Sequence, residues 1–278
     1  MSVQHGWPLR LLRTVQFGVA RLASRDGYVE ARAVPFDLRF TGPAADAITR
    51  HIYRYGAHEP HIARYLLEHV RLGPEDIAFD IGANLGWYSV LLQRLSEPGA
   101  RIFSFEPDPE TFRLLSANLR ANDADRVTAM NVALGEKPGV AELHRYKDSN
   151  NGRHTLLAGD NGGGTVRVAV TTLRDLWQSE HLGARPIRFL KIDVEGFEYF
   201  VLRGAGELLS RCACVLMEYT PTSLELAGVK ASDLIGLLEA AGLQARAFIG
   251  GAPRPMSFSE LAQAQTQHEL LLTPRASA

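Results

Sequence analysis

The chain has little cysteine, no long apolar run and no excess of charge of either sign. Its two cysteines, Cys212 and Cys214, are two residues apart. In an extended segment such residues lie about 6 to 7 Å from each other, beyond easy disulfide closure. No run approaches the roughly 20 apolar residues that span a bilayer, and arginines interrupt the apolar stretches near the N-terminus. We therefore expect a reduced, cytoplasmic protein without a signal peptide or stable membrane insertion.

The balance of charge also narrows the class of partner. Lysine and arginine total 30 against 31 acidic residues, so no global field draws the chain to nucleic acid, and a nucleic-acid substrate is disfavoured. With 278 residues and 46% hydrophobic residues the chain can bury a full core. We expect one α/β domain over 71–278, preceded by a cap segment over 1–70 that holds a helix, a hairpin and two helices. The sequence defines no oligomeric state.

The cap segment begins with an amphipathic pattern. Apolar residues recur at helical spacing and arginines lie mostly elsewhere on the surface of that helix: Leu9, Leu12, Val15, Val19, Leu22 and Arg10, Arg13, Arg21, Arg25. Such a helix can lie on a membrane surface or dock its apolar stripe on the main domain. Docking is the preferred interpretation, because surface helices of globular proteins routinely show this pattern.

From about residue 71, short β-rich segments alternate with helical ones, which is the pattern of βαβ units around a mostly parallel sheet. The expected strands cover 77–81, 101–106, 127–133, 187–193, 213–218, 245–249 and 268–272, and the expected helices cover 87–95, 109–121, 198–209 and 231–241, with one more after Thr172. Residues 139–145 and 165–170 predict an edge hairpin around a long Gly- and Asn-rich loop. Together they predict a Rossmann-like fold of about seven strands with helices on both faces.

The most specific motif is FDIGANLGWYS at 79–89, where the first strand turns into the first helix. Gly82 and Gly86 permit a tight turn and a close backbone approach to a cofactor. A dinucleotide site usually has a glycine where this chain has Asn84, and the carboxylate of Asp80 would repel a pyrophosphate. An acid at this edge suits the ammonium group of S-adenosylmethionine instead.

A second motif, FEPDP at 105–109, follows the second expected strand. The two carboxylate oxygens of Glu106 match the two adjacent hydroxyls of an adenosine ribose, and Pro107 beside it is expected to belong to the same cofactor-binding set. Any strand that ends in Glu before a proline turn could supply this residue, so the assignment depends on the first motif as well.

A third motif, FLKIDVEGFE at 189–198, places Lys191, Asp193 and Glu195 at alternate positions of an expected strand. The three charged side chains should therefore share one face near the ligand-binding edge. A Lys191–Asp193 ion pair that only supports the sheet is the structural alternative. Because unused buried charges are rare, we favour a catalytic set with Asp193 near the transferred methyl group.

Five strings in this order and spacing resemble the FkbM family of methyltransferases: FDIGANLGWYS, FEPDPETFRLLSANL, NVALGE, TTLRDL and FLKIDVEGFEYFVLRGA. The resemblance covers roughly 53–220, because YRYGAHEP at 53–60 is similar to the family as well. It implies a class I methyltransferase fold, S-adenosylmethionine as cofactor, and O-methylation of a sugar or natural product. The chain departs from the family at Arg174, where the family usually has an acid. If that acid binds substrate, the preferred acceptor changes; if it only caps a helix, the change is minor.

Topology and resemblance together suggest further site residues. Asn131, Val132 and Ala133 would contact the adenine, and Glu59 would close over the methionine end, although helix capping before Pro60 explains that residue equally well.

The acceptor hydroxyl needs a proton acceptor or a Lewis acid. Asp193 and Glu218 resemble the metal-binding acids of catechol-type O-methyltransferases, so Mg²⁺ is one hypothesis and a metal-free base the other. His154, in the long loop, is the competing base. Two other classes stay open: a nicotinamide-dependent oxidoreductase on the same sheet, and a cofactor-binding module without turnover. The expected partner is a small hydroxylated acceptor, sugar-like or polyketide- or peptide-like.

Overall fold

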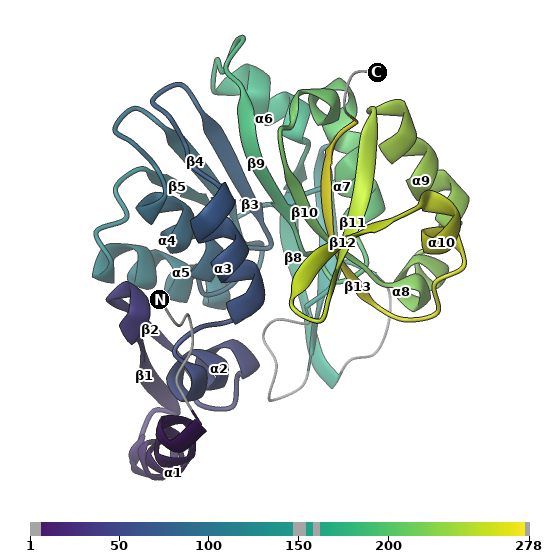
Figure 1. The fold of residues 1–278 in the computed structure, drawn as a ribbon. Helices are drawn as coiled ribbons and strands as arrows, with labels where there is room; N and C mark the ends of the chain where they lie inside the picture. Colours follow the sequence, from purple (N-terminus) through teal and green to yellow (C-terminus); the bar gives the residue numbers. More distant parts are fainter. Residues whose placement is uncertain (1–6, 147–153, 158–161, 276–278) are drawn as a thin grey trace.

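The computed structural model describes residues 7–146, 154–157 and 162–275, and an eight-stranded sheet crosses its centre (Figure 1). The strand order is β12-β11-β13-β10-β9-β3-β4-β5. The strands are β3 (Ile77–Ile81), β4 (Arg101–Phe105), β5 (Val127–Met130), β9 (Ile187–Ile192), β10 (Val215–Tyr219), β11 (Leu243–Ile249), β12 (Ala252–Met256) and β13 (His268–Pro274). The five strands from β10 to β5 run parallel, whereas β13 lies antiparallel between β10 and β11. The predicted Rossmann-like α/β fold is confirmed, with one more strand than expected.

Helices cover both faces of the sheet because the parallel strands are buried on both sides. Along β3, Ile77, Phe79 and Ile81 pack into one core with α6 (Leu173–Ser179), α7 (Glu198–Ala205) and α9 (Ala231–Ala240). The intervening Ala78 faces the other core, formed with α3 (Pro60–His69), α4 (Trp87–Arg94) and α5 (Pro109–Ala121). Burying a side chain such as Phe79 contributes about 2 to 3 kcal/mol, so the centre of the sheet is a stable platform for the segments at its carboxyl edge.

The N-terminal segment packs on this second core through its hairpin and its second helix, whereas its first helix joins a separate small cluster through Phe17. It comprises α1 (Trp7–Ala23), the antiparallel hairpin of β1 (Tyr28–Ala33) and β2 (Leu38–Pro43) around a 3₁₀ turn (Val34–Phe36), and α2 (Ala47–Tyr55). Asn118 of α5 and Asn122, which caps the end of that helix, exchange hydrogen bonds with the backbone of Thr41 and Arg39, and so tie the edge of β2 to the main domain. The division of the chain after residue 70 stays a prediction.

Several expected element boundaries are wrong. The strand expected over 127–133 is split: β5 ends at Met130, and β6 (Ala133–Leu134) belongs to a separate sheet with β8 (Gly162–Thr171) and β7 (Gly139–Tyr146). The helix expected over 198–209 is α7 followed by a 3₁₀ helix (Gly206–Arg211). Three short elements were not predicted, because they are too short to show periodicity: α8 (Pro221–Leu226), α10 (Phe258–Ala262) and β12.

The expected docking face of α1 is also wrong. Leu12, Val15 and Val19 are 53%, 62% and 62% exposed, whereas Phe17, outside the expected stripe, is buried against Tyr53. Within the described ranges, no helix is both long and apolar enough to cross a membrane.

Candidate active site

A cavity of about 360 Å³ opens at the carboxyl edge of the central strands. Its lining comes from the segments that follow β3, β4, β9 and β10, from α2 and its connection to α3, from the segment 154–157 and from β13. Cavities of this size hold small ligands, and the carboxyl edge is where open α/β sheets bind them.

The turn after β3 has the left-handed backbone that its glycines predict. Gly82 has φ +78°, and a Cβ built there would lie 1.8 Å from the carbonyl oxygen of Asp193. The close approach that Gly82 permits is therefore an approach to the protein's own backbone at Asp193. Asn84 also has a positive φ, of 50°, and it lines the cavity. Gly86 starts α4 with φ +90° and does not line the cavity.

Glu106 lies at the end of β4 with both carboxylate oxygens held by backbone N–H groups. Asn84 N–H donates to Oε2 at 3.0 Å and Asp108 N–H donates to Oε1 at 2.9 Å. The side chain lines the cavity and is only 6% exposed, and this burial raises its pKa to about 8. Two rigid donors leave lone pairs on each oxygen for a diol, so the geometry fits the predicted ribose contact.

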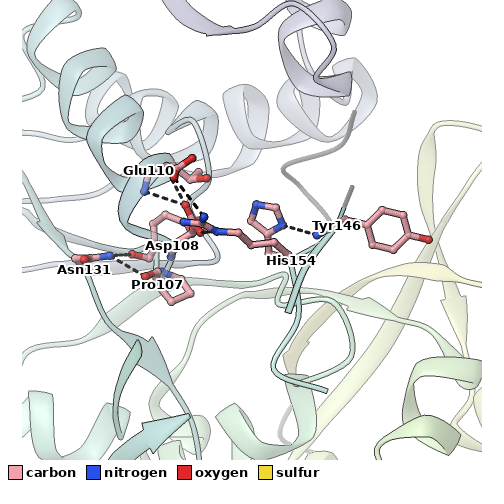
Figure 2. Close-up of polar contacts among 9 residues, drawn as sticks. Pro107, Asp108, Glu110, Asn131, Tyr146 and His154 are labelled. Carbon is pink, nitrogen blue, oxygen red and sulfur yellow. Dashed lines mark hydrogen bonds and ion pairs between the residues drawn. The ribbon is translucent and has the colours of Figure 1, made fainter. Parts of the chain in front are cut away.

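The adenine contacts predicted after the third strand divide into two kinds. Val132 and Ala133 line the cavity. Asn131 does not, because its amide donates to the carbonyl oxygens of Glu106 and Pro107 at 2.8 and 2.9 Å (Figure 2). Asn131 therefore fixes the turn that carries Glu106, and Pro107 lines the cavity from that turn.

Asp80 is fully buried and is not part of the cavity wall. Its Oδ2 accepts from Ser89 at 2.6 Å, and its Oδ1 lies 3.6 Å from Lys191 Nζ. This position does not support the expected direct contact with an ammonium group. It supports an indirect role, because Asp80 helps to hold Lys191, which does line the cavity.

Lys191 connects the centre of the site. Its Nζ donates to the carbonyl oxygen of Gly82 at 3.1 Å, lies 3.2 Å from Asp193 Oδ2, and sits 5.0 Å from the ring centroid of Tyr88. Burial alone would lower the pKa of this ammonium, but Asp193 and Asp80 outweigh it and the pKa is raised. The Lys191–Asp193 ion pair, the alternative in which these charges only support the sheet, is therefore present. It lies in the cavity wall, however, and the Asp193 side chain is 38% exposed.

The prediction that Lys191, Asp193 and Glu195 share one strand face is wrong for Glu195. Strand β9 ends at Ile192, so strand alternation does not direct Glu195. Glu195 lies in a turn with φ +51°, where its carbonyl oxygen accepts from the Thr155 hydroxyl at 2.7 Å. Glu195 still lines the cavity. So do His154 and Leu156 of the segment that contacts this turn through Thr155.

Glu59 is the N-cap residue directly before α3, but its side chain makes no capping hydrogen bond. Instead it accepts a hydrogen bond from the hydroxyl of Tyr88 and lines the cavity. Burial would raise the pKa of Glu59, yet His58, Tyr88 and Lys191 outweigh it and the pKa is lowered. The cavity interpretation therefore fits better than capping. Tyr88 was missed, although it lies inside the first motif, because its neighbours come from other segments.

Glu218 ends up opposite a second acid that no sequence pattern revealed. Glu269 of β13 lies directly opposite Glu218 of β10 in the strand register, and both residues line the cavity. Burial raises the pKa of Glu218 to about 7, and burial together with Glu59 and Asp193 raises that of Glu269 to about 9. Glu218 Oε1 accepts from Thr220 and Oε2 from Gln267, each at 2.7 Å.

None of these contacts supports the hypothetical magnesium site. The described part of the chain holds no cluster of three or more His, Cys, Asp or Glu side chains arranged for a metal. Of the two proposed ligands, Asp193 is paired with Lys191, and Glu218 accepts one hydrogen bond at each oxygen, from Thr220 and Gln267.

His154 lines the cavity from the long loop, whose residues 147–153 and 158–161 lie outside the described chain. Its Nδ1 accepts from the backbone N–H of Tyr146 at 3.1 Å, and burial lowers its pKa (Figure 2). A neutral ring in this arrangement carries its proton on Nε2, so neither nitrogen offers a free lone pair to a substrate hydroxyl. The contacts of His154 therefore disfavour it as the base. Arg174, the family departure, is exposed on α6 and does not line the cavity.

An open sheet with this parallel order, a glycine turn after its first central strand and a buried carboxylate after the next is the arrangement of class I methyltransferases. The FkbM methyltransferase domain matches residues 80–244 of the chain. Since this is more than half of the sequence, the chain belongs to the FkbM methyltransferase family, and the predicted resemblance is confirmed.

Individual relatives are more distant. The chain is 33% identical to 31-O-demethyl-FK506 methyltransferase FkbM of Streptomyces tacrolimicus over 172 residues, which are 51% of this chain and 64% of that protein. It is 27% identical to hexuronic acid methyltransferase AglP of Haloferax volcanii over 212 residues, 75% and 78% of the two chains. The match to methyltransferase sdnD of Sordaria araneosa is 32% over 155 residues, 46% and 60% of the two chains. The matched region is thus less than two thirds of the first and third of these proteins.

Among solved structures, methyltransferase FkbM from Methylobacillus flagellatus superposes with a TM-score of 0.45 at 18% identity, covering 74% of this chain and 45% of that one. This likeness is too distant to support an argument.

Proposed function

We propose that the protein transfers a methyl group from S-adenosylmethionine to a hydroxyl oxygen of a sugar or another small natural product. The observation that carries this proposal is the cavity at the carboxyl edge of the sheet, in which a diol-binding Glu106 and a second, acidic end share one space in a chain of the FkbM methyltransferase family. Among the relatives described above, 31-O-demethyl-FK506 methyltransferase is named for methylation at oxygen.

The residues at one end of the cavity fit the cofactor. Glu106 is preorganised for the ribose hydroxyls, and Val132 and Ala133 offer an apolar wall for the adenine. Asn84 lines the cavity with a buried Oδ1 that has no hydrogen-bond partner within the described chain, and so offers an acceptor to a ligand donor. When bound, S-adenosylmethionine supplies an electrophilic methyl group on a sulfonium centre.

At the other end, Asp193 is the proposed proton acceptor. Of the two carboxylates paired with Lys191, Asp193 is the exposed one, whereas Asp80 is fully buried. Lys191, fixed by Gly82 and by Asp80, holds the orientation of the Asp193 carboxylate. Methyl transfer is an in-line displacement, so these residues act by aligning the hydroxyl and removing its proton.

The first test is titration of the purified protein with S-adenosylhomocysteine, with NAD in parallel. We expect binding in the micromolar range for S-adenosylhomocysteine alone, weakened at least about tenfold in Glu106→Gln. The matched control is the exposed Glu225→Gln. Preference for NAD, or undiminished binding in Glu106→Gln, would contradict the cofactor site.

Turnover tests the second half of the proposal. With a panel of hydroxylated acceptors, Asp193→Asn should reduce kcat by about 10²-fold or more while leaving the affinity for S-adenosylhomocysteine within about threefold. Activity should persist after exhaustive chelation. Full activity in Asp193→Asn would remove this residue from the role of base.

A further inference from the structure

Helix α1 turns its apolar side away from the protein. Its buried contact is Phe17, 6% exposed, which packs edge-on against Tyr53 of α2 with ring centroids 5.1 Å apart. The outward side carries five large apolar side chains with exposures of 53 to 88%: Leu11, Leu12, Val15, Val19 and Leu22. In Figure 1 the helix lies at the far edge of the molecule, beyond β1 and α2.

These five residues form one continuous stripe. Positions 11, 15, 19 and 22 follow the spacing of a single helix face, and position 12 lies beside it. Folded monomers rarely expose a contiguous apolar patch of this kind without a binding role. Hereafter it is called the α1 stripe.

The orientation of α1 is determined by contacts on its arginine side. The guanidinium of Arg13 lies 5.8 Å from the ring centroid of Tyr53, and Arg54 of α2 donates to the hydroxyl of Thr14 at 2.9 Å. These contacts, together with Phe17, hold the helix with its α1 stripe outward. The exposure is therefore a feature of the docked helix.

Charge identifies the partner that suits this surface. Helix α1 contains three arginines and no acidic residue, and residues 7–55 contain eight arginines against four acids, although the whole chain has a net charge of −1. Arg21 in α1 and Arg25 just after it are exposed. Two copies joined stripe to stripe would bring these arginines together without an acid of α1 to pair with them. An anionic surface would instead attract them.

We propose that α1 is an interfacial helix that attaches the protein to an anionic lipid bilayer, with the α1 stripe in the outer acyl region and Arg21 and Arg25 at the level of the lipid phosphates. An amphipathic helix with an arginine-bearing side and a Leu- and Val-rich side binds in this way without spanning the bilayer. The active-site cavity and its chemistry are not part of this inference.

Flotation of the full chain with lipid vesicles tests the proposal. Vesicles of phosphatidylcholine with about one third phosphatidylglycerol should carry the protein, and pure phosphatidylcholine should carry at least about tenfold less. Val15→Glu with Val19→Glu should abolish flotation. The control, Val140→Glu with Leu226→Glu, places the same charges at residues that are 61% and 79% exposed elsewhere and should not change it.

A second pair of variants tests the charge component. Arg21→Gln with Arg25→Gln should weaken binding severalfold and flatten its dependence on salt, whereas the exposed pair Arg113→Gln with Arg120→Gln should not. Absence of flotation for the parent protein would overturn the proposal. So would a dimer in light scattering that Val15→Glu with Val19→Glu dissolves, because a second copy would then cover the α1 stripe.

Discussion

The two ends of the cavity are built in different ways. At the end of β4, Glu106 is held by backbone N–H groups of Asn84 and Asp108, which lie 22 and 2 residues away in the sequence. At the end of β10, Glu218 and Glu269 meet across two strands 51 residues apart, and the bonds to Glu218 come from side chains. Adjacent strands are about 4.8 Å apart, so three strand spacings separate β4 from β10 by about 14 Å.

This difference indicates which end can change. Backbone donors do not depend on side-chain identity, so the Glu106 end presents one invariable shape to a cofactor. The acidic end depends on individual side chains from the connection between α2 and α3, from β10 and from β13, and a single substitution alters it. We infer that acceptor choice is controlled mainly at the acidic end.

The largest effect is expected where the two ends meet, at Gly82. In Gly82→Ala the new Cβ would overlap the Asp193 carbonyl oxygen at 1.8 Å, in a residue with φ +78°. We expect a loss of about 3 kcal/mol or more in the free energy of unfolding, measured by denaturant titration. The control, Gly236→Ala in α9, has open space for its Cβ and no positive φ, and should leave stability equal or raise it by up to about 1 kcal/mol. Equal stability of Gly82→Ala and the parent would refute the assigned contact.

The Glu106 end should bind its cofactor in a pH-dependent manner. The pKa of Glu106 is raised to about 8, so near neutral pH the free protein must release a proton before an ionised carboxylate can accept the ribose hydroxyls. The affinity for S-adenosylhomocysteine should therefore increase as pH rises from about 6.5 to 8.5, by up to about tenfold per unit, in calorimetric titrations. Glu106→Gln should bind weakly with a flat profile over this window. A similar slope in that variant would assign the proton to another group.

The smallest effect is expected at the acidic end, in the pH dependence of the free energy of unfolding. The pKa of Glu269 is raised from 4.5 to about 9, so the folded protein retains a proton that the unfolded chain releases. Its contribution to stability is full below pH 4.5 and is lost as pH rises toward 9. Between about pH 6 and 7, the parent should therefore lose on the order of 1 kcal/mol more than Glu269→Gln, in thermal or denaturant unfolding. Glu225→Gln, exposed on α8, should follow the parent. Parallel profiles for the parent and Glu269→Gln would show that Glu269 is not protonated in the folded state.

The sequence by itself determined the βαβ order, the left-handed turn at Gly82 and the position of Glu106 after β4. Each depends on local signals: hydrophobic period, glycine at a positive φ, and a short span between a strand and its turn. The FkbM resemblance depends on the same short strings and was confirmed for residues 80–244.

Only the tertiary structure decided which of these residues reach the cavity. It buried Asp80 beneath Lys191, directed Asn131 to backbone carbonyls, and ended β9 before Glu195. It also placed Glu269 opposite Glu218 and turned the α1 stripe outward, since strand pairing and helix docking depend on contacts between segments far apart in the chain. A local pattern specifies which side chains share a face, whereas the partner of that face is decided by packing across the whole fold.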